Sequence, residues 1–487
     1  MQYVTGKLFL LLGLLSIGNV VQAQLPSSDP LGLGIAPASD ALDEVDSQAG
    51  LPSLTRLFAL ALENDSELMR QRYESQATGQ EVPMARAALR PQIEASASAI
   101  YQRADNIYTQ NPEDYPAEVY DDRISGTTND TLWRIDVTQP LFSLERWRSV
   151  DKALAQADAA DLRIVVAERN LALSLVDAYL NAYLASRKLG LLDAKREALN
   201  LQRRQAQRAY DLGIGDRINL LEAQSRLDQA VADQVKAENE LANALSDLER
   251  LTGRLPDFRG SALGGIEPVT LEHEWENTQQ WLSRVDDNAE VRLANQLYQV
   301  AQLDTGVRRA GHYPELNLTV GYRDLNSSDE LRSSEDVTAS LELDIPIYRG
   351  GYTSASIRQG ELVALASREA LTNERRLAGQ EVRKRLRSLQ GNARQLEALS
   401  RSIESSQLFL EAAIRGENLG LRDLVDVLDA RAELYDLRIQ FVEVLCQYLG
   451  DKTYLEAATG ALDTADLIAI TARLREVSQA PESSSGA

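Results

Sequence analysis

The sequence predicts an α+β membrane protein in which two internal repeats each supply two β-strands and one long helical hairpin. The first observation is self-similarity, because residues 248–255 (LERLTGRL) recur as residues 455–462 (LEAATGAL). The second is the absence of proline from residues 142–255 and 347–480, which allows helices longer than a compact domain can hold. The third is a set of short segments, upstream of each helical stretch, in which apolar and polar residues alternate.

The repeat extends along most of the chain at an offset of about 207 residues. Gly213 corresponds to Gly420, and Ala223 corresponds to Ala430. The apolar seam is duplicated as well, as Leu220, Ala223, Leu227 and Ala230 in the first copy and Val427, Ala430, Leu434 and Leu437 in the second. We therefore expect each copy to contain a helix, two strands and two further helices, in that order.

The long helices of each copy are expected to fold back on one another. Residues 143–210 have the pattern of one helix of nearly seventy residues, roughly 100 Å long. The chain reverses at 211–216 in the first copy and at 417–420 in the second, where glycine permits the left-handed residue that ends a helix. The glycines of these two turns are Gly213, Gly215 and Gly420. The two turns therefore form tips at the far end of the rods.

Strict alternation predicts the strands. Residues 316–322 and 337–345 alternate in the second copy, and residues 93–98 and 133–138 alternate in the first. The same pattern fits hairpins on a soluble core, but the long rods favour a membrane sheet. Four strands per chain are too few for a membrane barrel, which needs about eight, and lipid does not tolerate an open edge. Closure therefore requires several chains, and three chains would give twelve strands.

The N-terminus is typical of a secretory signal peptide at residues 1–23. Lys7 precedes an apolar run at 8–17, and residues 21–23 (VQA) form a cleavage signal. Residues 24–50 are rich in Pro, Gly, Ser and Asp and are expected to form a flexible leader. The apolar run has about ten residues, fewer than the roughly twenty that a transmembrane helix needs. The mature chain is expected to leave the cytoplasm without such a helix.

Composition excludes several function classes. The chain has 51 Lys and Arg against 73 Asp and Glu, and a net charge of −22 would repel a nucleic acid. One cysteine, Cys446, and two histidines, His273 and His312, leave little material for a metal centre or redox chemistry. We expect no catalytic residues, no metal site and no cofactor, and we expect Cys446 to be a packing residue.

Three motifs resemble those of the TolC family of trimeric outer-membrane efflux and type I secretion channels. The motifs are residues 139–142 (QPLF), 346–351 (PIYRGG) and 420–430 (GLRDLVDVLDA), and the likeness covers residues 54–470. The resemblance implies a trimeric, twelve-stranded outer-membrane β-barrel with four strands per chain. It also implies that a long α-helical barrel of coiled-coil hairpins continues the β-barrel across the periplasm of a Gram-negative bacterium.

The repeats and the resemblance together divide the mature chain. The predicted order after the leader is a first repeat at 51–255, a linker or equatorial segment at 256–280, a second repeat at 281–462, and a C-terminal equatorial segment with a disordered tail at 463–487. The equatorial segments are implied to form a belt around the helices at mid-length.

The resemblance implies that Asp426 and Asp429 line the periplasmic aperture. Their i, i+3 spacing puts both carboxylates on one face of a helix just beyond Gly420. Threefold symmetry would gather six carboxylates near the axis, where they would admit cations and attract divalent blockers. The alternative is a solvated helix face, in which Arg422 pairs with Asp426 and Asp429 faces water.

The two tips differ in charge. The first copy has Asn219 and Glu222 at the positions of the two aspartates, so we expect the second copy to lie nearer the axis. Family members often have an aromatic residue three places before the tip glycine, whereas this sequence has Glu417 there. The resemblance therefore leaves the closing contact of the aperture open, with Arg422 as one candidate.

Aromatic residues near the strand ends have two interpretations. Tyr101, Tyr108, Trp133, Trp147 and Tyr348 fit either a girdle at a membrane interface or ordinary packing on the sheet.

The function implied by the resemblance is a passive exit duct rather than an enzyme. The duct would carry secreted proteins or small toxic compounds from an inner-membrane pump of the RND or ABC type and a periplasmic adaptor. The trimer would sit in outer-membrane lipid. The main alternative is a coiled-coil scaffold or stalk without channel activity. A hydrolase built on Asp426 and Asp429 is disfavoured, because a rod tip offers no enclosing pocket.

Overall fold

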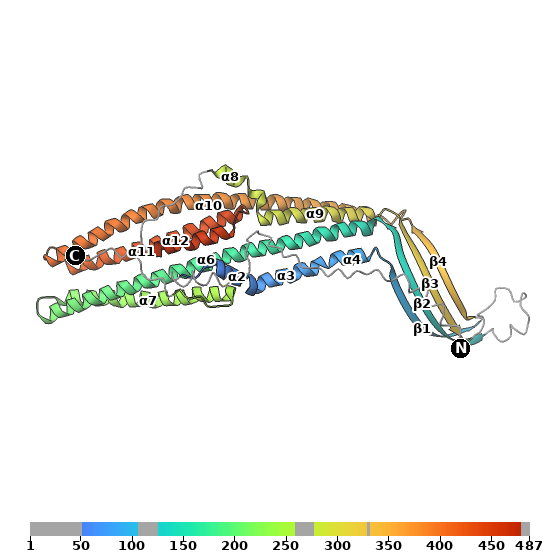
Figure 1. Ribbon diagram of the computed structural model, residues 1–487, viewed down its shortest axis with the longest axis horizontal. Coiled ribbons are helices and arrows are strands. Elements are labelled where there is room, and N and C mark those ends of the chain that lie inside the picture. The colour runs from blue at the N-terminus through green and yellow to red at the C-terminus, as the bar shows by residue number, and fades with distance from the viewer. Residues whose placement is uncertain (1–50, 106–124, 259–276, 329–331, 479–487) are drawn as a thin grey trace, which may run out of the picture.

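The computed structural model describes residues 51–105, 125–258, 277–328 and 332–478. They form a long bundle of helices with an inclined sheet at one end (Figure 1). The predicted signal peptide at 1–23 and the leader at 24–50 lie outside the described residues, as do Tyr108 and His273.

The elements follow one another in the order that the repeat predicts, with additional short helices. In chain order they are α2 (Leu54–Asn64), α3 (Ser66–Gly79), α4 (Glu81–Ala87), β1 (Gln92–Asp105), β2 (Ser125–Ser143), α6 (Leu144–Asp211), α7 (Arg217–Thr252), α8 (Thr278–Leu282), a 3₁₀ turn (Val285–Asp287), α9 (Ala289–Ala310), β3 (Glu315–Ser327), β4 (Ser334–Asp344), α10 (Tyr352–Asn418), α11 (Leu424–Ala458) and α12 (Thr464–Ser478).

The two longest helices set the length of the molecule. α6 has 68 residues and α10 has 67, about 100 Å each at 1.5 Å per residue. The predicted helix over 143–210 is therefore confirmed. The Ser143 hydroxyl caps α6 by accepting a hydrogen bond from the Arg146 amide at 3.4 Å. Neither helix contains a proline, so no intrahelical hydrogen bond is lost along the rod.

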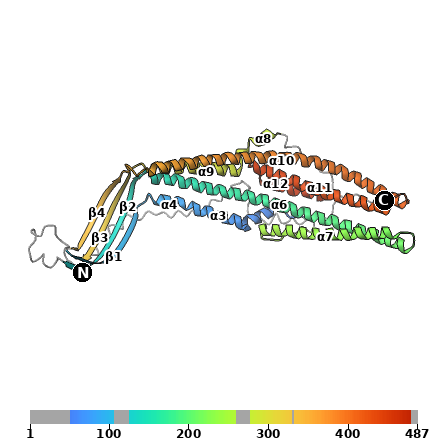
Figure 2. The same ribbon diagram turned by 180° about the vertical axis from the view of Figure 1, so that it is seen from behind.

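Each long helix has a shorter antiparallel partner in the half of the bundle away from the sheet. α7 packs on α6 and α11 packs on α10 (Figures 1 and 2). Alanine recurs every seven residues along the buried seam of α7, at Ala223, Ala230, Ala237 and Ala244. These small side chains let the two helices approach closely in a coiled-coil arrangement. The duplicated hairpins that the sequence predicts are therefore present.

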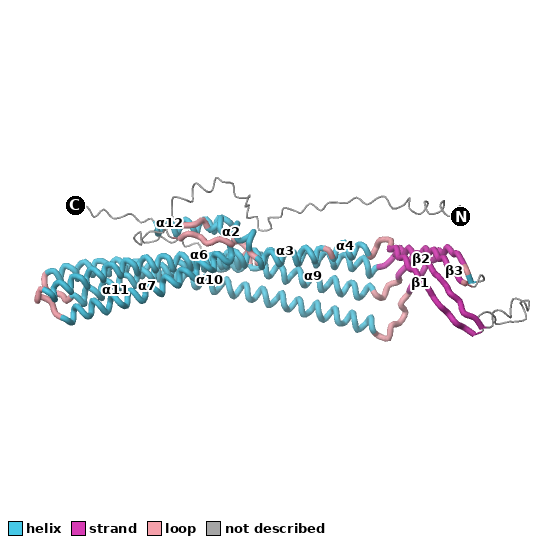
Figure 3. Tube along the Cα trace, turned by 90° about the horizontal axis from the view of Figure 1, so that it is seen from below, coloured by secondary structure: helices cyan, strands magenta, loops and turns pink. Residues whose placement is uncertain are grey.

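In the half of the bundle next to the sheet, other helices replace α7 and α11. α9 packs against both α6 and α10, and α3 and α4 pack on α6. Figure 3 shows these helices side by side, running into the sheet. This half of the molecule is therefore a single layer of helices that continues the layer of strands.

The sheet has four antiparallel strands in the order β1-β2-β3-β4. Within the described residues, β1 and β4 each pair with one neighbour, so both edges of the sheet are open. β2 continues through Pro140 to Ser143, with a bulge between Pro140 and Phe142. The bulge accommodates a proline, which cannot donate a ladder hydrogen bond.

The register separates the sheet into one apolar and one polar face. One row across β2, β3 and β4 is Ile135, Tyr322 and Val337, and the next row is Asp136, Gly321 and Thr338. The apolar face lacks a cover in a single chain, because Trp133 is 63% and Val337 75% exposed. An uncovered apolar sheet face of this extent is typical of an interaction surface or a membrane surface.

The hydrophobic core lies at mid-length, where α2 and α12 cover one side of the long helices (Figure 3). Phe58 of α2, Tyr179 of α6 and Leu474 of α12 are fully buried there. The Tyr179 hydroxyl donates a hydrogen bond to the Pro52 carbonyl at 2.7 Å. Most of the predicted equatorial segment at 256–280, namely 259–276, lies outside the described residues, and the predicted C-terminal segment at 463–487 includes α12. The sequence does not predict that α2, from the N-terminal side, is part of this belt.

None of the helices in the described residues combines the length and the apolarity needed to cross a membrane.

Candidate functional site at the helix tips

The two tip turns depend on glycine for different reasons. Gly213 and Gly420 adopt left-handed conformations with φ of 73° and 69°, as expected of residues that end a helix. Gly215 is not left-handed. A Cβ atom on Gly215 would lie 2.9 Å from the Cβ of Ala209, and its amide donates to the Ala209 carbonyl at 2.9 Å. Gly215 is therefore needed for close approach of the backbone.

Asp426 lies in the first turn of α11, beside Arg422. The Arg422 guanidinium is 3.3 Å from the Asp426 carboxylate, and both side chains are about half exposed. The same guanidinium lies 5.8 Å from the centroid of the Phe409 ring on α10. Arg422 thus joins the two helices of the second hairpin at its tip, and Asp426 is ion-paired within its own chain.

Asp429 does not simply face water, as the solvated-face alternative expected. Its carboxylate accepts a hydrogen bond from Arg226 of α7 at 2.8 Å, and Arg226 also donates to Glu222 at 2.8 Å. The hydrogen bond to Glu222, with the charge of Asp429, holds the pKa of Arg226 above its usual range. Because α7 belongs to the first hairpin and α11 to the second, this ion pair links the two hairpins.

Sequence reasoning missed Arg226. Its i, i+4 spacing from Glu222 was visible, but the link to Asp429 spans 203 residues. Asn219, the counterpart of Asp426, is part of the cap of α7 instead, because its backbone N–H donates to the Asp216 carboxylate at 2.7 Å. The structure therefore brings Glu222, Asp429 and Arg226 together, whereas the hydrogen bonds of Asn219 go to Asp216.

Two further contacts hold the hairpins together near the tips. Leu199 of α6, Ala230 of α7 and Leu428 of α11 form a small buried apolar cluster. Closer to the belt, Lys195 of α6 pairs with Asp436 of α11 at 3.2 Å. The tips are therefore joined by a few small contacts, most of them at the surface.

The belt joins the same helices through a denser polar network. Arg385 of α10 pairs with Asp451 of α11 at 2.6 Å and lies 4.1 Å from the centroid of the Tyr454 ring. The Tyr454 hydroxyl donates to Asp177 of α6 at 2.5 Å. Burial, followed by this hydrogen bond, raises the pKa of Tyr454 to about 12. The contacts between the helices are therefore more buried in the belt than at the tips.

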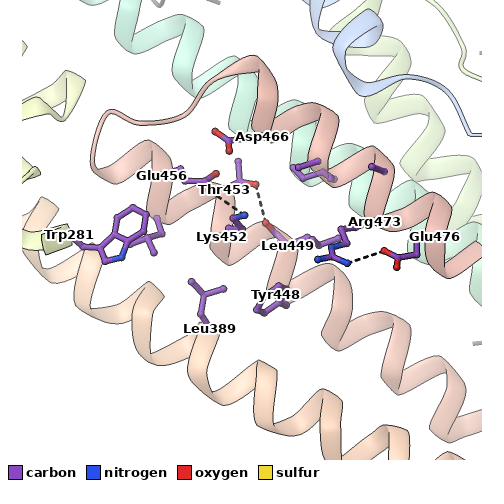
Figure 4. A pocket seen from close by; sticks show the side chains of 14 residues that line it. Trp281, Leu389, Tyr448, Leu449, Lys452, Thr453, Glu456, Asp466, Arg473 and Glu476 are labelled. Atoms are coloured by element: carbon purple, nitrogen blue, oxygen red, sulfur yellow. Dashed lines mark hydrogen bonds and ion pairs between the residues drawn. The ribbon is translucent and has the colours of Figure 1, made fainter. Parts of the chain in front are cut away.

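A cavity of about 340 Å³ lies in the belt between α8, α10, α11 and α12 (Figure 4). Glu456 of α11 faces it, is 8% exposed, and hydrogen bonds to Asp466 of α12. Burial and the charge of Asp466 raise the pKa of Glu456 to about 8, against the opposing effect of Lys452, 3.8 Å away. This carboxyl pair connects α12 to the long helices.

None of these arrangements supplies a nucleophile with an adjacent base. Groups of three or more potential metal ligands are absent from the part of the chain that the structure describes. Cys446 is buried, and burial raises its pKa to about 12, so its thiol stays protonated at neutral pH.

Comparisons with known proteins show which family the fold belongs to. The family model for outer membrane efflux proteins matches residues 57–254 and 285–461, one segment in each repeat. The chain is 26% identical to the outer membrane protein TolC of Vibrio cholerae over 444 residues, which are 90% of this chain and 97% of that one. It is 27% identical to the proteases secretion protein PrtF of Dickeya chrysanthemi, over 85% of this chain and 89% of that one.

Solved structures agree on the fold. CusC superposes with a TM-score of 0.71 at 19% identity, covering 84% of this chain and 92% of that one. The Campylobacter jejuni CmeC outer membrane channel superposes with a TM-score of 0.71 at 16% identity, covering 87% of this chain and 89% of that one. The chain therefore belongs to the outer membrane efflux protein family and is a non-enzymatic, TolC-type outer-membrane channel of the tripartite export systems of Gram-negative bacteria.

Proposed function

We propose that three copies of this chain close one twelve-stranded barrel and one helical tube, forming an exit duct from the periplasm to the outside. The observation that carries the proposal is the four-stranded sheet with an apolar face and two open edges among the described residues. Unpaired backbone groups at such edges are too costly in lipid, so identical copies must pair edge to edge. Three copies of four strands make twelve, enough to close around a lumen.

The polar face of the sheet would line this lumen. Asp136, Gly321 and Thr338 form one row of that face. Arg134 and Asp136 on β2 lie on the same face and pair at 2.6 Å. The charged residues of this face would then stay in water while the apolar face meets lipid.

The helix tips would form the periplasmic aperture. Three copies of Asp426 and Asp429 would surround the axis. Within each chain, Arg422 pairs with Asp426 and Arg226 pairs with Asp429. Ion pairs between side chains that are about half exposed stabilise by roughly 0–1 kcal/mol each. An adaptor that binds the tips can therefore break them, separate the hairpins and free the carboxylates. The belt network would act as the fixed end of this movement.

The proposed partners are a periplasmic adaptor and an inner-membrane pump of the RND or ABC type. Secreted polypeptides are the better supported cargo, because PrtF and the alkaline protease secretion protein AprF of Pseudomonas aeruginosa each match about 85% of this chain. Small toxic compounds are the second cargo class. Crosslinking in living cells and identifying the attached inner-membrane protein tests the pump, and comparing secreted proteins with drug sensitivity in a deletion strain tests the cargo.

Planar bilayers test the aperture directly. The purified channel is expected to give small, cation-selective currents that polyvalent cations block from the periplasmic side. Replacing Asp426 and Asp429 together by Asn should weaken this block. The control is the Glu238→Gln, Glu249→Gln double variant, which removes the same charge from exposed positions along α7. Equal block in the wild type and both double variants would contradict the proposal that these aspartates line the entrance.

The link between the hairpins has its own test. Arg226→Gln removes the bond to Asp429 and should raise the resting conductance, because the hairpins lose a contact that keeps them together. Arg196→Gln is the matched control, since Arg196 pairs at 3.7 Å with Asp193 of its own helix. A resting conductance that is unchanged in Arg226→Gln contradicts the proposed role of this pair.

A further inference from the structure

A groove of about 660 Å³ lies between α6 and α9, close to the periplasmic ends of the strands. Arg148 of α6 lines one wall and Arg309 of α9 lines the other. Leu144 and Leu303 supply apolar surface, and Tyr313, which is 54% exposed, lies at the end next to the sheet. The groove thus has a cationic part and an apolar part.

The contacts of α6 indicate that this groove opens on the outer side of the helix layer. Trp147 packs edge-on against Phe142 with ring centroids 5.2 Å apart. Phe142 is paired with Leu316 and lies on the apolar face of the sheet. Leu144, which lines the groove, is the helical neighbour of both residues, because it stands three residues before Trp147 and four before Arg148. The groove therefore continues the surface that meets lipid.

Further from the sheet, the same two helices have charged side chains that already pair with one another. Lys152 of α6 pairs with Asp304 of α9 at 2.7 Å, and Asp304 also pairs with Arg308 at 2.7 Å. These charges are satisfied by one another. Arg148, in contrast, has a carboxylate of Asp151 at 3.9 Å, and its side chain is 50% exposed. Arg148 is therefore available to an added anion.

Arg309 is more strongly paired but remains accessible. Its guanidinium donates to the Glu361 carboxylate of α10 at 2.9 Å, while the Arg309 side chain is 60% exposed. The Glu361 carboxylate also pairs with the Arg358 guanidinium at 3.4 Å. The groove arginines and their ion-pair partners, Arg148, Arg309 and Arg358 against Asp151 and Glu361, carry one net positive charge in a protein with a net charge of −22. Glu145 lies nearby, with its carboxylate 3.9 Å from the place where a Cβ on Gly311 would be.

The height of the arginines matches the phosphate level of a membrane. Arg148 lies four residues beyond the start of α6 at Leu144, about 6 Å at 1.5 Å per residue. A bilayer has roughly 5–8 Å of headgroup region beyond its hydrocarbon core on each side. Because the apolar face of the strands extends to their periplasmic ends, the arginines lie where phospholipid phosphates are found.

We propose that the groove between α6 and α9 binds an anionic phospholipid of the periplasmic leaflet, with its phosphate between Arg148 and Arg309 and its acyl chains along the apolar face of the sheet. Basic pockets between helices at a membrane surface recognise anionic headgroups in this way. Gly306 lines the same groove, and nothing lies within 4 Å of the place where its Cβ would be. This glycine keeps the space for the headgroup open.

The test uses full-length, delipidated protein in detergent and measures thermal stability with added phosphatidylglycerol, phosphatidylcholine or inorganic phosphate. Phosphatidylglycerol is expected to stabilise more than phosphatidylcholine. Its apparent affinity should fall about twenty-five-fold in the Arg148→Gln, Arg309→Gln double variant, at about five-fold per arginine. The control double variant, Arg196→Gln with Arg415→Gln, removes two exposed, weakly paired arginines at the tip end and should leave the affinity unchanged.

Gly306→Leu gives a second test that keeps both arginines. The added side chain fills the groove, so phosphatidylglycerol binding should fall while the fold is retained, because the Cβ meets no atom and leucine favours a helix. Equal stabilisation by both lipids, or equal losses in the two arginine double variants, overturns the proposal. Equal protection by inorganic phosphate also overturns it, because the site would then bind a free anion rather than a lipid.

Discussion

We expect the carboxyl pair of the belt to make the docking of α12 dependent on pH. Glu456 is 8% exposed and shares a hydrogen bond with Asp466, and its pKa is raised from 4.5 to about 8 by burial and by that neighbour. The pKa of Asp466 is raised as well, chiefly by burial. The other charged groups at the cavity are Lys452 of α11 and Arg473 and Glu476 of α12.

A raised carboxyl pKa means that the folded chain holds the proton more tightly than the unfolded chain. The contribution of Glu456 to stability is therefore complete below pH 4.5 and is lost as the pH rises to about 8. For each unit that the pH rises in this range, the stabilising free energy from Glu456 falls by about 1.4 kcal/mol. Between pH 5 and pH 8 the free energy that holds α12 in place should fall by about 4 kcal/mol, or roughly a thousand-fold in the opening equilibrium.

Hydrogen exchange of the α12 amides measures this opening. In the wild-type protein their protection factors, corrected for intrinsic exchange, should fall steeply from pH 5 to pH 8. In Glu456→Gln the slope should be much shallower, because glutamine keeps the neutral form at every pH. Glu443→Gln removes a carboxylate from an exposed position of the same helix and should retain the wild-type slope. Protection of α12 that is independent of pH in the wild-type protein would refute the reasoning.

Three further predictions concern the belt and its surroundings. Arg385→Gln should lower the free energy of unfolding by about 3 kcal/mol, because it leaves the largely buried Asp451 carboxylate without its arginine. Thermal unfolding in detergent measures this loss of stability. Gly460→Ala should also lower the free energy of unfolding, by about 2 kcal/mol or more. The φ angle of Gly460 is 66°, and a Cβ there would clash with the Asp287 carbonyl oxygen. A variant that melts at the wild-type temperature contradicts this prediction. In the native protein the Cys446 thiol should resist maleimide at pH 8, because it is buried and its pKa is about 12. It should react fully once the protein is unfolded. Mass spectrometry measures the labelling, and rapid labelling of the native protein contradicts the burial of Cys446.

Local patterns in the sequence predict most of the fold. The absence of proline predicts α6 and α10, because a single proline would have broken either helix. Alternation in residues 316–322 predicts β3 and its apolar face, because the side-chain period of a strand is two. The predicted turns at Gly213 and Gly420 are present because glycine alone adopts a left-handed conformation without cost.

Long-range contacts account for what the sequence could not predict. The link from Arg226 to Asp429 depends on how two hairpins, more than two hundred residues apart in sequence, lie against each other. The packing of α2 into the belt depends in the same way on contacts with α6 and α12. The continuation of β2 through Pro140 depends on a bulge, which alternation does not reveal.

The candidate site was predicted in part. The spacing of Asp426 and Asp429 indicates a shared helix face, and the family resemblance suggests its place at an aperture. Neither could show that each carboxylate has an arginine partner, one from the tip turn just before its helix and one from the other repeat. The groove between α6 and α9 gave no sequence signal at all, because its two arginines stand 161 residues apart on helices of different repeats.

The number of chains in the particle tests the account most directly. A four-stranded sheet with open edges and an apolar face requires identical copies for closure. Native mass spectrometry of the protein extracted gently from outer membranes should therefore give the mass of three chains. A monomer that remains dispersed in buffer without detergent would contradict the account.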